Sequence, residues 1–106
     1  MLFFAAHKMA RTFVWDDNDA KLLVLGPFSA FEMLCAWATA SGWFASGADE
    51  TQPHVLAGLL ARLSSQRMAV QALIICFLAD MSDGARRARF RRLALERLDF
   101  VVVYRL

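Results

Sequence analysis

The chain has 106 residues, of which 58% are hydrophobic and 21% are charged, and its formal net charge is +2. This length fits a single small domain spanning 1–106, and the composition excludes a disordered protein, which needs low hydrophobicity and high net charge. A folded chain of this size still exposes about a third of its unfolded surface. The apolar surplus therefore predicts a surface that is covered by a partner or a membrane, or that forms a large exposed patch.

The first predicted element is a β-hairpin near the N-terminus. Two short runs rich in β-formers, 11–15 and 21–25, flank the turn residues Asp16-Asp17-Asn18-Asp19. The first run is also compatible with the end of an N-terminal helix, so this alternative stays open.

The clearest element is a helix over 30–41. Ser29 and Glu32 have the S-x-x-E spacing of a capping box, and Gly42 suits the left-handed position after a helix C-terminus. Apolar residues lie on every side of this helix, which is typical of a buried or lipid-embedded helix.

A membrane-spanning helix is the alternative for this region. Between 22 and 48 the only charged residue is Glu32, but that carboxylate would cost about 2.5–3.5 kcal/mol at mid-membrane. The helix over 30–41 is also too short to cross a bilayer at about 1.5 Å per residue. Integral membrane insertion is therefore not expected.

Two further helices are predicted in the middle of the chain. Pro53 suits the first turn of one, and apolar residues follow it at helical spacing: Val55, Leu56, Leu59, Leu60 and Leu63. The strongly apolar run 68–79 predicts a second, buried helix. Periodicity alone also allows a buried strand over 72–78.

The C-terminal part predicts a helix over 85–98 and then a strand over 99–104. That strand would lie beside the N-terminal hairpin. The predicted fold is thus α+β and mainly helical, with about four helices and a small antiparallel sheet from the N-terminal hairpin and the C-terminal strand. The alternative is an all-α fold.

An arginine cluster opens the helix over 85–98, and propensity does not explain it. Positive charges at a helix N-terminus are unfavourable, and like charges at this spacing repel. One interpretation pairs them with Asp16, Asp17, Asp19 or Glu50; the other makes them a site for an acidic partner. The candidate partner-binding residues are Arg86, Arg87, Arg89, Arg91 and Arg92.

Catalytic and cofactor motifs are not recognisable in the sequence, so we expect no enzyme and no cofactor. The two histidines and two cysteines match no zinc-site spacing. Cys35 and Cys76 lie in apolar runs and are expected to be buried thiols in a reducing, cytoplasmic compartment.

The expected function is a non-enzymatic protein-interaction module, such as an adaptor, an inhibitor or an assembly subunit. It would bind a protein partner or form a homo-oligomer through its surplus apolar surface, and the arginine helix would add electrostatic contacts. The alternative is binding of nucleic acid or another polyanion through the helix over 86–97.

Overall fold

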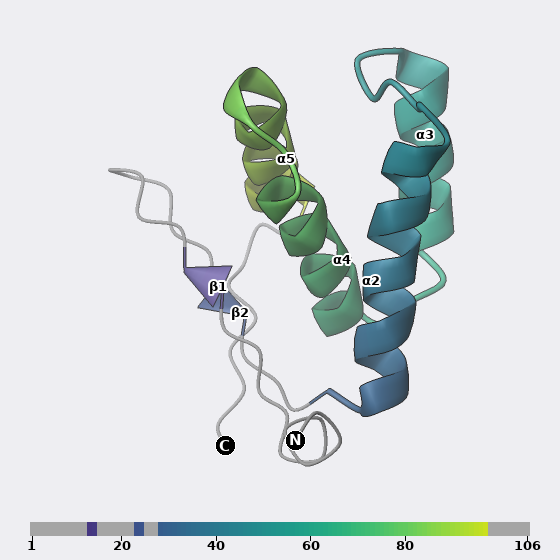
Figure 1. Cartoon of the computed structure of the whole chain (residues 1–106), viewed down its shortest axis with the longest axis vertical. Helices are drawn as coiled ribbons and strands as arrows, with labels where there is room; N and C mark the ends of the chain where they lie inside the picture. The colour runs from purple at the N-terminus through teal and green to yellow at the C-terminus, as the bar shows by residue number, and fades with distance from the viewer. Residues whose placement is uncertain (1–12, 15–22, 25–27, 98–106) are drawn as a thin grey trace.

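The computed structural model of the chain describes residues 13–14, 23–24 and 28–97. The described part is mainly helical. Its helices are α2 (Ala30–Ala45), α3 (Pro53–Leu63), α4 (Met68–Asp80) and α5 (Gly84–Arg97). Successive helices run in opposite directions, so the chain passes up α2, down α3, up α4 and down α5 in the view of Figure 1.

The strands of the described part are β1 (Phe13–Val14) and β2 (Leu23–Val24), which pair antiparallel with Phe13 opposite Val24. This two-residue pair does not amount to the predicted sheet, and the helices by themselves fit the all-α alternative. The predicted strand over 99–104 and the turn Asp16–Asp19 lie outside the described residues.

The predicted capping box at the start of α2 is confirmed. The Ser29 hydroxyl accepts a hydrogen bond from the Glu32 amide, and the Glu32 carboxylate accepts one from the Ser29 amide, both at 3.0 Å. Each bond satisfies a backbone donor that the first turn of a helix leaves without a partner.

The predicted end of this helix is wrong. The helix continues through Gly42 to Ala45, and Gly47 takes the left-handed conformation at φ 71° instead. A glycine inside a helix weakens it by about 1 kcal/mol but does not end it. One further turn buries Trp43, whose burial stabilises the longer helix.

The central element is α4, which packs against α2 on one side and α5 on the other. Every residue from Ala69 to Ala79 is buried. The region 72–78, where the sequence allowed a strand or a helix, is therefore helix. The buried residues Leu59 and Leu63 confirm the apolar stripe predicted for α3.

The two cysteines differ in their exposure to solvent. Cys76 is buried in α4, and burial raises the pKa of its thiol. Cys35 is exposed on α2, so the expectation that both thiols are buried is wrong for this residue. Among the helices that the structure describes, none has both the length and the apolar run needed to cross a membrane.

Candidate interaction surface

The two sides of α2 differ in their burial. The side that faces the core is formed by Ala36, Ala40 and Trp43, and its two alanines allow the helix backbone to approach α4 closely. The large side chains of Phe31, Leu34 and Trp37 point outward and are 73%, 62% and 51% exposed. The interpretation of α2 as a buried helix is therefore wrong for its outward side.

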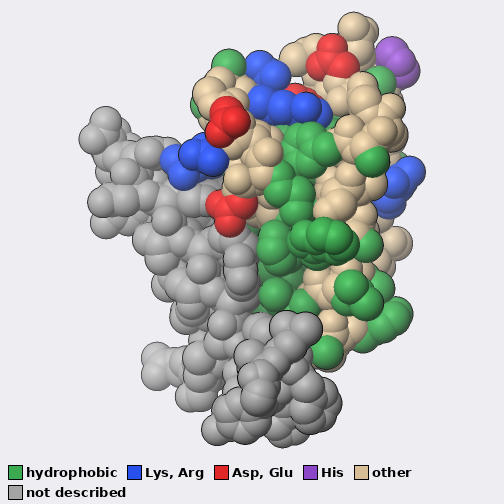
Figure 2. Space-filling model, in the orientation of Figure 1, with side chains coloured by type: hydrophobic (Ala, Val, Ile, Leu, Met, Phe, Trp, Pro, Cys, Tyr) green, Lys and Arg blue, Asp and Glu red, His purple; other side chains and the backbone are tan. Residues whose placement is uncertain are grey.

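The outward side of α2 carries no charge. We call it the α2 face; its eight exposed residues are Ala30, Phe31, Leu34, Cys35, Trp37, Ala38, Gly42 and Ala45. Glu32, the one charged residue of this helix, sits beside the face and pairs with Arg67, whose Nε lies 2.8 Å from a Glu32 carboxylate oxygen. Figure 2 shows hydrophobic side chains down the middle and lower part of the view, while the visible charges lie in its upper half.

An exposed apolar face of this kind is costly for an isolated domain. Burying a Phe or Leu side chain stabilises a fold by about 1.5–3 kcal/mol, and Phe31 and Leu34 forgo most of that gain in this chain. Sequence periodicity missed the face because a helix that is apolar on every side does not indicate which side points inward. One feature of the sequence could have indicated the inward side: Ala36 and Ala40 are four residues apart, so they lie on the same side of the helix and allow close packing there.

The arginine cluster is partly engaged inside the fold. Glu50 precedes α3 and its side chain is 5% exposed; its two carboxylate oxygens pair with Arg86 at 2.9 Å and with Arg89 at 3.3 Å. Arg86 also lies over the Phe44 ring, 4.5 Å from its centroid. Of the acidic partners that the sequence suggested, Glu50 is the one within the described residues, and it binds two of the five arginines.

The burial of Glu50 by itself would raise its pKa. The hydrogen bonds that the carboxylate accepts from its own backbone amide, from Arg86 and from the Trp43 indole outweigh burial, so the pKa of Glu50 lies below its ordinary value. The group is therefore ionised at neutral pH and joins the end of α2 to the first two turns of α5.

Two other arginines of the cluster differ in their surroundings. The Arg87 guanidinium donates to the carbonyls of Ala79 and Asp80 at the end of α4, where a positive charge suits the helix dipole. Arg92 is exposed, and no ion pair joins it to another described residue. The sequence did not predict the capping role of Arg87, because it does not show which backbone carbonyl groups lie within reach of a side chain.

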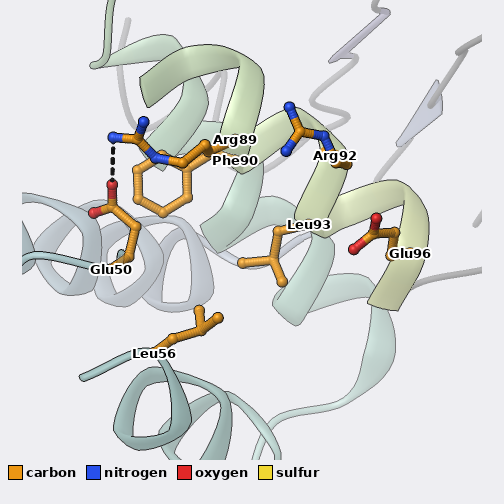
Figure 3. Close-up of a pocket in the computed structure, with 7 residues that line it drawn as sticks. All are labelled: Glu50, Leu56, Arg89, Phe90, Arg92, Leu93 and Glu96. Carbon is orange, nitrogen blue, oxygen red and sulfur yellow. Dashed lines mark hydrogen bonds and ion pairs between the residues drawn. The ribbon is translucent and has the colours of Figure 1, made fainter. Parts of the chain in front are cut away.

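A shallow hollow lies between α3 and α5. Its volume is about 160 Å³, below the roughly 300–1,000 Å³ of typical ligand pockets. Figure 3 shows Leu56 of α3 and Leu93 of α5 at its floor, with Arg89, Arg92 and Glu96 beside them. Phe90 is fully buried against this floor, so it is a core residue and does not present a ring for stacking on a base.

Within 28–97 and the two short strands, no group of three or more His, Cys, Asp or Glu side chains lies close enough together to hold a metal ion. Comparison with protein-family models, with curated proteins and with solved structures found no match to this chain.

Proposed function

We propose that this chain is a non-enzymatic protein-interaction module, acting as an adaptor, an inhibitor or an assembly subunit, and that it associates through the α2 face. The observation that carries the proposal is the outward placement of Phe31, Leu34 and Trp37 on a helix face without charge. Aromatic and aliphatic side chains of this size anchor protein interfaces, whose buried centres are depleted in charge.

The arginines of α5 have a secondary part in this proposal. Arg86 and Arg89 are held by Glu50, so the exposed Arg92 is the member best placed to attract an acidic group on a partner. The same pairing weakens the alternative of polyanion binding, because Glu50 offsets one of these two positive charges and holds both guanidinium groups against the fold, so fewer of them can displace counterions from a phosphate backbone. A cytoplasmic location belongs to the proposal as well, since the exposed thiol of Cys35 suits a reducing compartment.

The test is affinity purification from the native host with three baits, each with and without nuclease. The baits are the wild-type chain, a face variant (Phe31→Gln, Leu34→Gln and Trp37→Gln) and a control variant (Met68→Gln and Met81→Gln). The control removes two exposed apolar side chains that do not belong to α2.

The proposal expects the wild type and the control to retain proteins after nuclease treatment, and the face variant to lose them. Two results would contradict it: a face variant that retains every partner, or bound material that nuclease removes. The second result would favour the polyanion alternative, and Arg92→Gln should then weaken binding with a reduced salt dependence.

A further inference from the structure

We infer that the occupant of the α2 face is a second copy of this chain, whose own α2 packs antiparallel against the first about a two-fold axis. This inference rests on the proposed function and names its partner. Such an interface uses the same patch on both copies, so the α2 face must be complementary to itself.

Self-complementarity is visible in the order of residues along α2. The first half carries the large exposed side chains Phe31, Leu34 and Trp37 together with Ala30 and Cys35, and the second half carries only the small exposed residues Ala38, Gly42 and Ala45. The midpoint of Ala30–Ala45 falls between Trp37 and Ala38. An antiparallel copy centred there sets each large half against a small half.

The helical geometry makes this match specific. At 1.5 Å and about 100° per residue, a two-fold axis at the midpoint places Phe31 of one copy between Gly42 and Ala45 of the other. A parallel pair would instead set large residues against large ones at one end and leave a gap at the other.

Gly42 has no role within one copy. A Cβ added there would meet no atom within 4 Å, and its φ lies outside the left-handed region that favours glycine. Glycine inside a helix lowers helix stability, so the fold alone favours alanine at this position. Close approach of the Phe31 ring from a second copy is compatible with glycine here; Gly58 in α3 is equally open, so the glycine alone does not carry the inference.

The area of the face suits a weak dimer. An aromatic side chain offers about 150–250 Å², so Phe31 and Trp37 at their observed exposures contribute roughly 200–300 Å² per copy. Leu34 and the five small residues add a similar area. Two copies would then bury about 800–1,200 Å², at or below the lower end of specific interfaces, which corresponds to a weak and reversible dimer.

Charge favours a second copy over a lipid surface. Helices that lie in a membrane interface have Lys and Arg on their polar side, whereas α2 has no basic residue. Two copies of the α2 face bring no like charges together, and an antiparallel pair aligns the two helix dipoles favourably.

The first test compares the same substitution at two glycines by sedimentation velocity over a range of concentrations. Gly42→Leu adds bulk where the second copy approaches, and Gly58→Leu adds it to α3 at an equally open position. We expect a concentration-dependent dimer for the wild type and for Gly58→Leu. Gly42→Leu should raise the dissociation constant of the dimer at least tenfold. Its circular dichroism and melting temperature should stay those of a folded helical chain.

The second test reports the orientation of the two copies. Ala38 lies next to the proposed axis, so Ala38→Cys in a Cys35→Ser background should form a disulfide between copies on mild oxidation, since bridged Cα atoms lie about 4.4–6.8 Å apart. Ala61→Cys, at an exposed position of α3 in the same background, is the matched control and should stay reduced.

Three results would overturn the inference. One is a dimer that persists in Gly42→Leu and forms no Ala38→Cys disulfide. Another is binding of the wild type, but not of the face variant, to vesicles of anionic phospholipid. The third is a monomeric chain whose α2 face captures a different protein; the proposed function would then survive while its partner changes. If the wild type is a monomer and the face variant keeps every host partner, both the proposed function and this inference are wrong.

Discussion

The side chain of Glu50 contacts more side chains than any other carboxylate described above, since it binds Trp43, Arg86 and Arg89. Replacing this buried carboxylate leaves the hydrogen-bond donors and positive charges around it without an anionic acceptor. Glu50→Gln should therefore lower the free energy of unfolding by about 1–3 kcal/mol. Urea denaturation of the variant, with Arg92→Gln as an exposed control from the same helix, measures this.

A double-mutant cycle identifies the ion pair as the cause. Once Glu50 is replaced, Arg89→Gln should cost clearly less than it does in the wild type, because the two residues are coupled. Equal costs of Arg89→Gln in the two backgrounds would show that the ion pair contributes nothing to stability.

The acid sensitivity of the fold follows from two carboxyl groups. The hydrogen bond from Arg67 is the largest effect on Glu32 and lowers its pKa. For Glu50, the bonds described above outweigh burial and also lower the pKa. A carboxyl with a lowered folded-state pKa contributes stability that is full above its unfolded pKa and is lost as pH falls through the folded pKa.

We therefore expect the urea midpoint of the wild type to fall between about pH 6 and about pH 3. The variant with both Glu32→Gln and Glu50→Gln should lose less over the same interval, although it starts from a lower stability. If both proteins show the same change of midpoint with pH, these two groups are not the titrating ones.

At the scale of the element, the start of α2 depends on one hydroxyl. Ser29→Ala removes the acceptor for the Glu32 amide and should cost about 0.5–2 kcal/mol. Glu32→Gln should cost less, because glutamine preserves the box and the ion pair to Arg67 is partly exposed and worth at most about 1 kcal/mol. Thermal denaturation followed by circular dichroism ranks the two variants, and the reverse order would contradict this account.

The end of α2 gives a second prediction. Gly47 has φ 71°, a conformation that costs a residue with a side chain about 1–2 kcal/mol, so Gly47→Ala should destabilise the fold by about that amount. Gly58 lies inside α3 with open space around it, so Gly58→Ala should stabilise by roughly 0.5–1 kcal/mol. A melting temperature that does not fall in Gly47→Ala would show that the helix end is misplaced, and one that falls in Gly58→Ala would show that the space around Gly58 is not open.

These elements also show what a sequence can and cannot predict. The capping box of Ser29 and the stripe of α3 depend on neighbours three or four residues apart, so local pattern was sufficient. The choice of Glu50 as the arginine partner depends on contacts across 36 and 39 residues, which only the packing of α2 against α4 and of α4 against α5 decides. The exposure of Trp37 depends on which side of an all-apolar helix meets α4.

At the scale of the whole molecule, the apolar surplus of the composition is divided between two helices. One is α4, which is buried from Ala69 to Ala79, and the other is α2, whose outer side remains open. Because α2 packs on α4 with its inner side, its outer side is left exposed to solvent. Composition predicted the surplus correctly, but only the packing locates it on α2.

The central claim is that this open face makes the chain associate, and light scattering of the purified chain at high concentration tests it most directly. The account predicts a mass above the 11.9 kDa of one chain, or a chain that stays in solution only with a bound partner. It also predicts a return to 11.9 kDa, with unchanged helicity, in the Phe31→Gln, Leu34→Gln and Trp37→Gln variant. A wild-type chain that is a stable, soluble monomer at the same concentration, and whose α2 face captures no other protein, would contradict the account.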